Sequence, residues 1–177
     1  MHSIKDKLLA YCGRASREET FSWVIAEIER NPDRFKELIQ CCLSNDSQLE
    51  FVAIWAVQHC VEKNPRLIAP FLGDLLDRLK RPSHDAMKRV FMRILMDIEL
   101  PEEYWGEIAE LSFGYVDSPG EAVAIRANAM SVAYKLCELL PELGNELEMI
   151  IRTHLEYGKK GFQARGKKIL KKLSQKK

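Results

Sequence analysis

One apolar pattern recurs four times in this chain, at intervals of 38, 38 and 37 residues. Each copy has apolar or small side chains at offsets 0, 4, 7, 8 and 11 from its first residue, which is the spacing of one face of an α-helix. We call this pattern the ladder. Its four copies are Leu49/Ala53/Ala56/Val57/Cys60, Met87/Phe91/Ile94/Leu95/Ile98, Ile125/Ala129/Val132/Ala133/Leu136 and Phe162/Gly166/Ile169/Leu170/Leu173. A period near 40 residues indicates stacked helix pairs, because one pair alone cannot bury its apolar face.

Helix-start signals agree with the ladder. Five prolines stand where helices are expected to begin, since the first turn has backbone N–H groups without partners; they are Pro32, Pro65, Pro101, Pro119 and Pro141. Three pairs have the spacing of a capping box, in which a hydroxyl and a carboxylate each accept a free N–H; they are Ser16/Glu19, Ser47/Glu50 and Ser118/Glu121.

The sequence thus predicts an all-α fold, a right-handed α-α superhelix or solenoid of about five antiparallel helix pairs. The outer and inner helices of the pairs are predicted at 3–12 and 16–30, 33–44 and 47–62, 65–80 and 84–99, 102–116 and 119–139, and 142–157 and 161–174.

We expect one domain over residues 1–177. The first pair fits the ladder poorly, because Glu29 and Pro32 fall at two ladder offsets. Residues 1–30 are therefore predicted to form a capping pair, followed by regular repeats over 31–158 and a basic C-terminal helix over 159–177.

Cysteine usage and hydropathy favour a cytoplasmic protein. The five cysteines are odd in number and form no Cys-x-x-Cys motif, which predicts buried thiols in a reducing compartment; they are Cys12, Cys41, Cys42, Cys60 and Cys137. No apolar run approaches the roughly 20 residues that span a bilayer, and the N-terminus has no uninterrupted apolar signal region. We expect a soluble protein without membrane contact, cofactor or metal.

The chain resembles HEAT-like and armadillo-like repeat proteins. Their units are antiparallel helix pairs with a proline in the outer helix and a basic residue early in the inner helix. Pro70, Lys88 and Arg126 match these positions, whereas Glu50 and Gln163 take the basic position in the other two copies. The resemblance covers residues 33–173 and implies the fold. It does not by itself imply an activity.

The side of each inner helix opposite the ladder should be polar if it only contacts water. Instead it carries aromatic, methionine and arginine side chains, a composition typical of partner-binding surfaces. The candidate partner-binding residues are Phe51, Ile54, Trp55, Arg89, Met92, Arg93, Met96, Met130 and Tyr134. The competing interpretation is that neighbouring inner helices pack together and bury several of these side chains as core.

Charge is distributed unevenly. Residues 159–177 hold nine of the 27 basic residues and none of the 26 acidic ones, so residues 1–158 carry 18 basic against 26 acidic side chains. The basic segment can bind phosphates, an anionic membrane or an acidic partner, or can be a solvated surface. Its candidate anion-binding residues are Arg165, Lys167, Lys168, Lys171 and Lys172. Membrane insertion is the least favoured, because its apolar side chains are needed for packing.

Catalytic motifs are weak. The four histidines form no His-Glu-x-x-His pattern, and no glycine-rich phosphate loop is present. The chain is similar in architecture to alkylpurine DNA glycosylases built from HEAT-like repeats, but none of its three tryptophans begins the Trp-Asp dipeptide of that family. Short chains similar to this one are sometimes labelled adenylosuccinate lyases. Those enzymes have a Gly-Ser-Ser signature, which this sequence does not contain.

We therefore predict a non-enzymatic scaffold whose inner-helix face binds a peptide or helix of another protein. The alternative is a nucleic-acid-binding protein that uses the basic last helix and the inner-helix arginines.

Overall fold

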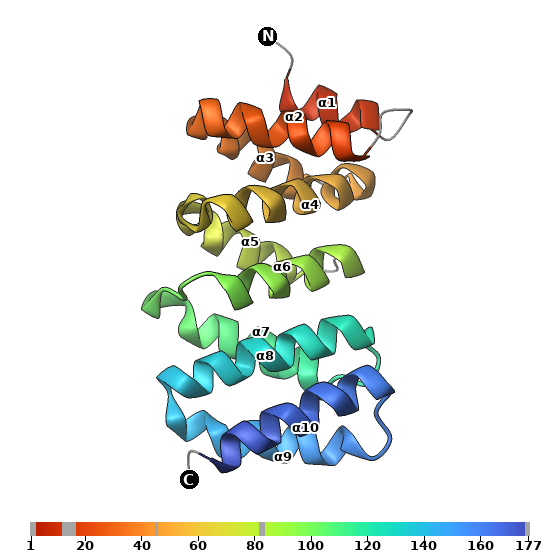
Figure 1. Cartoon of the computed structure of the whole chain (residues 1–177), viewed down its shortest axis with the longest axis vertical. Helices are drawn as coiled ribbons and strands as arrows, with labels where there is room; N and C mark the ends of the chain where they lie inside the picture. Colours follow the sequence, from red (N-terminus) through yellow and green to blue (C-terminus); the bar gives the residue numbers. More distant parts are fainter. Residues whose placement is uncertain (1–2, 12–16, 45, 82–83, 176–177) are drawn as a thin grey trace. The chain divides into compact units, whose positions relative to one another are not determined.

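The computed structural model describes residues 3–11, 17–44, 46–81 and 84–175 of the chain. Within these residues every regular element is an α-helix or a short 3₁₀ helix, and none is a strand (Figure 1). The all-α prediction is therefore confirmed. Two compact units divide the chain, unit 1 over Met1–Ile98 and unit 2 over Glu99–Lys177. The single domain with a capping pair at 1–30 stays a prediction, as does the right-handed sense of the superhelix.

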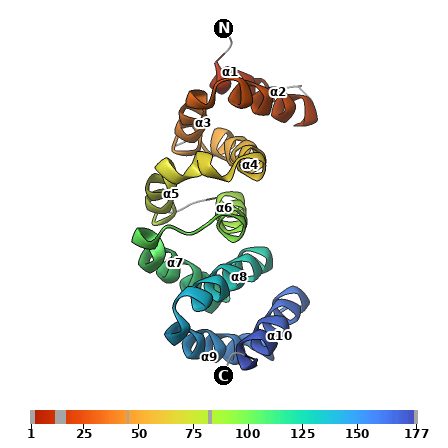
Figure 2. The ribbon, with the colours of Figure 1, turned by 60° about the vertical axis from the view of Figure 1, so that its left-hand side comes forward.

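Unit 1 alternates outer and inner helices. In Figure 2, α3 and α5 lie on one side of this unit and α4 and α6 on the other. The inner helix α4 packs against α2, α3 and α6. The elements of unit 1 are α1 (Ile4–Tyr11), α2 (Arg17–Arg30), η1 (Pro32–Arg34), α3 (Phe35–Cys42), α4 (Ser47–Lys63), η2 (Pro65–Phe71), α5 (Leu72–Leu79) and α6 (Asp85–Asp97).

Unit 2 repeats the arrangement with two pairs. The inner helix α8 packs against α7, α9 and α10, and α9 and α10 also contact each other. In Figure 2, α7 and α9 lie on one side of unit 2 and α8 and α10 on the other. Its elements are η3 (Glu102–Tyr104), α7 (Trp105–Asp117), α8 (Val123–Leu139), η4 (Pro141–Leu143), α9 (Gly144–Leu155) and α10 (Lys160–Ser174).

The ladder forms the core of both units. All of its side chains are buried except Leu170, which is half-buried. Outer helices supply the opposite wall, for example Leu72, Leu75 and Leu76 of α5 in unit 1. Burial of each apolar side chain of this size contributes roughly 1.5–3 kcal/mol relative to exposure. The repeated spacing was therefore the correct guide to the core.

Several outer helices begin with a 3₁₀ turn at the predicted prolines. Pro32, Pro65 and Pro141 open η1, η2 and η4, and Pro101 precedes η3. Asn31 and Asn64 cap two of these turns, and each side-chain oxygen accepts the N–H two residues on, at 3.2 and 3.3 Å. This Asn-Pro start is a signal that the repeat pattern did not include.

Other start signals were wrong. Pro119 precedes the start of α8 by four residues, and Ser118 ends α7, so Ser118 and Glu121 form no capping box. Asp46, not Ser47, caps α4, because its carboxylate accepts the N–H groups of Gln48 and Leu49 at 3.0 and 3.1 Å. A carboxylate one residue earlier outcompetes the predicted hydroxyl at the positive end of the helix dipole. The third predicted box depends on Ser16, which lies outside the described residues.

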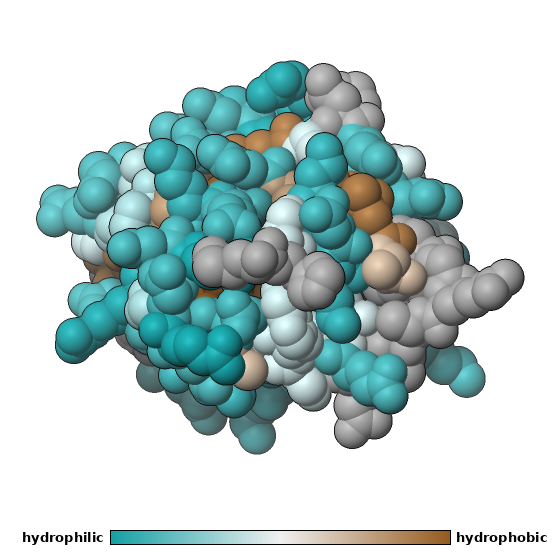
Figure 3. Space-filling view, turned by 90° about the horizontal axis from the view of Figure 1, so that it is seen from above, coloured by the Kyte–Doolittle hydropathy of each residue, from teal (hydrophilic) through white to brown (hydrophobic). Residues whose placement is uncertain are grey.

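The face turned upward in Figure 1, near α1 and α2, is largely hydrophilic. Figure 3 shows that the coloured residues visible there are mostly polar, with small and separate hydrophobic areas. Scattered apolar side chains are normal on a protein surface and do not mark an interaction site. The candidate functional residues lie instead on the inner helices, including α10.

Candidate functional site

Two neighbouring inner helices of unit 1 carry the exposed part of the predicted partner-binding set. We call Phe51 and Trp55 of α4 together with Arg89, Arg93 and Met96 of α6 the α4–α6 face. Arg93 is exposed and the other four side chains are half-buried. Because α4 packs against α6, these sequence-distant residues form one surface within unit 1.

A cation–π contact joins the two helices at this face. The guanidinium carbon of Arg89 lies 5.3 Å from the centroid of the Trp55 ring, within the range of roughly 6 Å over which such attraction acts. Phe51 meets the His84 ring edge-on, with 5.5 Å between the ring centroids. Arg93 donates from Nε to an Asp97 carboxylate oxygen at 3.1 Å. The face thus combines aromatic area with guanidinium charge.

Four of the nine predicted partner-binding side chains belong to the core instead. Ile54, Met92 and Met130 are 0% exposed, and Tyr134 is 6% exposed. This corrects the expectation that these four contact a partner. In unit 2 the reason is that α10 covers this side of α8: a Cβ on Gly166 would lie 3.9 Å from the Met130 methyl carbon. An inner helix has neighbours on several sides, so its buried arc is wider than the ladder alone.

The predicted anion-binding residues of α10 differ in their surroundings. Arg165 donates from Nη1 to the Ser131 hydroxyl at 2.8 Å, and the Lys172 ammonium lies 4.8 Å from the centroid of the Tyr134 ring. Both side chains therefore contact α8. The remaining three are exposed: Lys167, Lys168 and Lys171.

The basic position that follows the start of the ladder has a structural role in unit 2. Arg126 donates from Nε and Nη2 to the Val116 carbonyl at 3.1 and 2.6 Å, and its guanidinium carbon lies 4.1 Å from the centroid of the Phe162 ring. Burial lowers the pKa of Arg126 from its ordinary value by removing water from the charge. Gln163 holds the same position in α10 and donates to the Glu156 carbonyl at 3.3 Å. Both side chains satisfy a carbonyl at the end of an outer helix.

In α4 the same position carries the opposite charge. The Glu50 carboxylate is buried and accepts three hydrogen bonds from Arg78 of α5, at 2.7 to 2.9 Å. A two-pronged contact of this kind is among the strongest between side chains. Glu50 therefore links α4 to the next outer helix, instead of completing the capping box that its spacing suggested.

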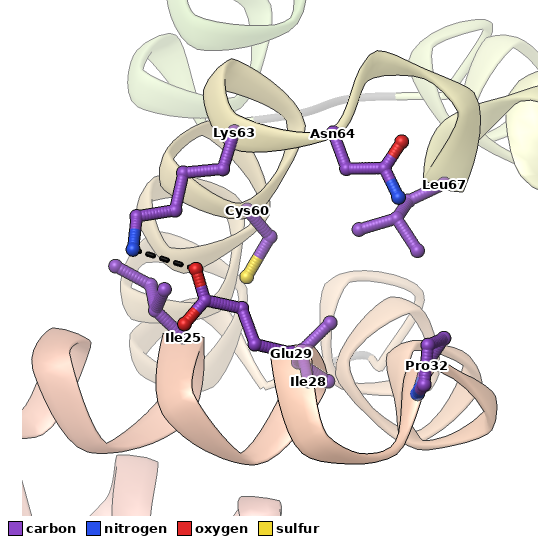
Figure 4. Close-up of a pocket in the computed structure, with 8 residues that line it drawn as sticks. All are labelled: Ile25, Ile28, Glu29, Pro32, Cys60, Lys63, Asn64 and Leu67. Carbon is purple, nitrogen blue, oxygen red and sulfur yellow. Dashed lines mark hydrogen bonds and ion pairs between the residues drawn. The ribbon is translucent and has the colours of Figure 1, made fainter.

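A cavity of about 180 Å³ lies between α2 and α4 of unit 1 (Figure 4). On its rim the Lys63 ammonium and the Glu29 carboxylate form an ion pair at 2.7 Å. In Figure 4 the Cys60 sulfur points toward α2, between this pair and Leu67. An apolar cavity of roughly 150 Å³ in another protein holds benzene, so this one has room for one aromatic or branched side chain. Its lining residues are Ile25, Ile28, Glu29, Pro32, Cys60, Lys63, Asn64 and Leu67.

Sequence reasoning missed this cavity. Cys60 was assigned to the ladder and Pro32 to a helix start, and both assignments are correct. The ladder predicts that Cys60 is buried, but it does not predict whether a second side chain or a cavity lies next to the thiol. The geometry arises where the ends of α2 and α4 meet the turns that follow them.

The described cysteines are buried free thiols, as predicted: Cys41, Cys42, Cys60 and Cys137. Cys12 lies outside the described residues. Burial raises the pKa of Cys41 to about 11 and that of Cys60 to about 12, so both are protonated at neutral pH and are poor nucleophiles. Across the described ranges no group of three His, Cys, Asp or Glu side chains is placed to hold a metal. No described helix is long and apolar enough to cross a membrane.

Fold and surface together define an all-α protein built from repeated helix pairs. The sequence model of the HEAT repeat domain matches residues 10–173, and the chain belongs to the HEAT repeat family. HEAT repeats generally mediate interactions between proteins, and the family is typically non-enzymatic. Neither a curated protein nor a solved structure matches the chain in the corresponding searches.

Proposed function

We propose that this protein is a non-enzymatic scaffold that binds a peptide or helix of a partner protein at the α4–α6 face of unit 1. The observation that carries the proposal is the stack of Arg89 on the partly exposed Trp55 ring. Tryptophan and arginine are the residue types most enriched among side chains that dominate binding energy. The buried free thiols support the expected cytoplasmic location.

The chemistry of the face favours an acidic partner with apolar anchors. Trp55 and Met96 offer apolar area, while Arg89 and Arg93 can pair with carboxylates at the rim, where charge mainly sets specificity and association rate. Displacing Asp97 from Arg93 requires only the loss of an exposed ion pair, which is worth about 0–1 kcal/mol.

The cavity beside Cys60 lies on the α2 side of the same helix, α4. Trp55, His59 and Lys63 are four residues apart, so they lie along one line of α4 that leads from the α4–α6 face to the cavity rim. Eight residues of helix span about 12 Å. A partner helix that docks on Trp55 therefore needs about two turns to place one apolar side chain in the cavity.

A charge-reversal pull-down tests the proposal. Wild-type protein and Arg89→Glu/Arg93→Glu protein are used to capture partners from a lysate of the native cell, and a Lys36→Glu/Arg66→Glu variant supplies a control with the same change in net charge on exposed residues of unit 1. We expect a partner that wild type and control recover and the Arg89/Arg93 variant loses, with at least about tenfold weaker binding by calorimetry. Equal recovery by all three proteins would contradict the α4–α6 face.

The alternative function is nucleic-acid binding through α10 and the inner-helix arginines. Exposed Lys167, Lys168 and Lys171 favour it. Counterion release would make such binding fall steeply with salt, and Lys167→Glu/Lys171→Glu would abolish it. The two functions are therefore distinguished by which pair of substitutions removes binding.

A further inference from the structure

Unit 2 separates its charges into two blocks. Residues 99–158 contain three basic and twelve acidic side chains, whereas residues 159–177 contain nine basic and no acidic ones. The net charges of the two blocks are therefore equal and opposite. On an ordinary solvated surface positive and negative side chains are interspersed, so this separation of charge is unusual.

Three lysines of α10 line up on its solvent side. Lys160, Lys167 and Lys171 are seven and four residues apart, which places them on one stripe of the helix, and all three are exposed. Among the described residues, none of the three has a carboxylate within ion-pair distance. The i,i+4 pair Lys167/Lys171 is repulsive, and Lys159 and Lys160 stand at the positive end of the helix dipole. Of the three, Lys171 lies in the last turn of α10, where the negative end of the helix dipole favours a cation.

The same stripe is covered in the preceding inner helix. Lys167 and Lys171 stand at ladder offsets 5 and 9, where α8 has Met130 and Tyr134, which are buried beneath α10. In α10 this side borders an open hollow of about 360 Å³ between α9 and α10. The hollow is lined by Arg152, Leu155, Glu156, Gln163 and Lys167.

The neighbouring helix presents a surface of opposite sign. Glu142 in η4, Glu146 in the first turn of α9 and Glu156 directly after its last residue are exposed. Two large side chains on the same helix and the turn after it are also open to solvent, Met149 at 63% and Tyr157 at 87% exposed. Methionine and tyrosine are enriched in the cores of protein interfaces relative to the rest of the surface.

We infer that the α9–α10 surface docks against the same surface of a second copy of this chain, with α10 of each copy lying along α9 of the other. A two-fold axis makes such a contact self-complementary, because each copy offers one acidic and one basic helix side by side. Glu142 and Glu146 of one copy offer two carboxylates to the ammonium groups of Lys167 and Lys171 of the other. Nucleic acid fits less well, because α7 to α9 of the same unit would repel phosphates.

Sedimentation equilibrium of the full chain tests this inference. Wild-type protein is measured at about 25 mM and about 300 mM salt, since screening at the higher concentration weakens contacts between exposed charges. We expect a mass of two chains at low salt and a dissociation constant at least about tenfold larger at high salt. A mass of one chain at every salt and protein concentration would overturn the inference.

Reversing the charges of one helix at a time distinguishes a specific α9–α10 contact between two copies from an effect of net charge alone. Lys167→Glu/Lys171→Glu protein has two acidic helices in the contact, and Glu142→Lys/Glu146→Lys protein has two basic ones. Each is expected to be monomeric alone, and an equimolar mixture is expected to restore the two-chain mass, because both contacts are complementary in the mixed pair. A mixture that stays monomeric would count against the α9–α10 contact.

Two controls keep the result interpretable. The Lys36→Glu/Arg66→Glu variant, altered only in unit 1, should associate like wild type, and circular dichroism should give the same helix content for every variant. In a parallel titration with a fluorescent oligonucleotide, wild-type binding that disappears in Lys167→Glu/Lys171→Glu protein, together with a one-chain mass, would assign α10 to nucleic acid instead. None of these measurements involves the α4–α6 face, so they succeed or fail independently of the scaffold proposal.

Discussion

Units 1 and 2 share the ladder but bury charge in different ways. At the position after the ladder start, unit 1 places Glu50 and neutralises it with Arg78 from the next outer helix. Unit 2 places Arg126 there and satisfies it with a carbonyl and the ring of Phe162. Across the four copies this position holds Glu50, Lys88, Arg126 and Gln163, so it is polar in every copy and its charge differs from copy to copy.

The two arrangements should differ in their sensitivity to substitution. A buried ion pair that loses one member leaves an uncompensated charge in a dry environment. A buried arginine that is replaced leaves only a neutral carbonyl without its donor, which costs less. Substitution therefore leaves a buried charge in unit 1 and a neutral carbonyl in unit 2.

Removing one charge from each unit tests this difference, and the effect is the largest that we expect. Glu50→Ala should lower the free energy of unfolding by about 3–5 kcal/mol, because Arg78 stays buried without the Glu50 carboxylate. Arg126→Met keeps the aliphatic stem and should cost about 1.5–3 kcal/mol. Urea unfolding followed by circular dichroism measures both. An Arg126→Met effect equal to or larger than that of Glu50→Ala would break the comparison.

A glycine pair in unit 2 gives the next largest effect, with opposite signs. A Cβ on Gly158 would lie 2.7 Å from a Phe162 ring carbon and 2.9 Å from the His154 carbonyl oxygen. Gly158→Ala should therefore cost about 1–3 kcal/mol by overpacking the contact that holds α10. Gly114 of α7 has nothing within 4 Å of such a Cβ, so Gly114→Ala should gain about 0.5–1 kcal/mol from helix propensity. Thermal unfolding of both variants checks the signs, and stabilisation by Gly158→Ala would contradict the tight turn.

The smallest effect is a pH dependence that belongs to unit 1. The buried Arg34 donates to both oxygens of Glu37 at 3.2 Å, and this hydrogen bonding lowers the pKa of Glu37 below 4.5. A carboxylate with a lowered folded-state pKa stabilises the protein above its unfolded pKa, and the stabilisation is lost as the pH falls through the folded pKa.

Glu37→Gln should therefore reduce the loss of stability below about pH 4.5, by at most about 1 kcal/mol because the pair is partly exposed. Melting temperatures of wild type and variant between about pH 3 and pH 6 provide the measurement. Parallel curves would show that other carboxylates carry the acid sensitivity. In unit 2 the hydrogen bonds of Arg126 go to a carbonyl, and Asp117 acts on its charge without a hydrogen bond, so Arg126→Met should change the slope less than Glu37→Gln does.

Much of the fold followed from local pattern. The predicted helix over 47–62 is α4, Ser47–Lys63, and the one over 161–174 is α10, Lys160–Ser174. The main boundary error was the start of α8, because Pro119 and Ser118 have the residue types of a helix start but lie in the turn after α7. A helix-start signal depends only on residue type, and several adjacent residues often have a suitable type, so the exact first residue stays ambiguous.

The candidate site was less predictable. Trp55 and Arg89, both predicted to bind a partner, are partly exposed, and their stacking joins two repeats and depends on how α4 packs against α6. Met130 shared the composition of that set and lies in the core because α10 covers it. The cavity beside Cys60 is lined by Glu29 and Pro32, the two residues at which the first pair departs from the ladder, and that departure was interpreted as a capping pair.

The sequence by itself determined the helices, the ladder and the charge blocks, because each depends on residues a few positions apart or on a count. Only the tertiary structure decided which polar residues are buried in pairs, such as Glu50 with Arg78, which inner-helix side chains remain accessible, and where helix ends leave a cavity. These properties depend on contacts between residues far apart in the sequence, such as Glu50 and Arg78, which are 28 residues apart. A local sequence pattern carries no information on the distance between such residues. The ladder predicts that one face of each inner helix is buried, and the packing of the helices determines which residues cover that face.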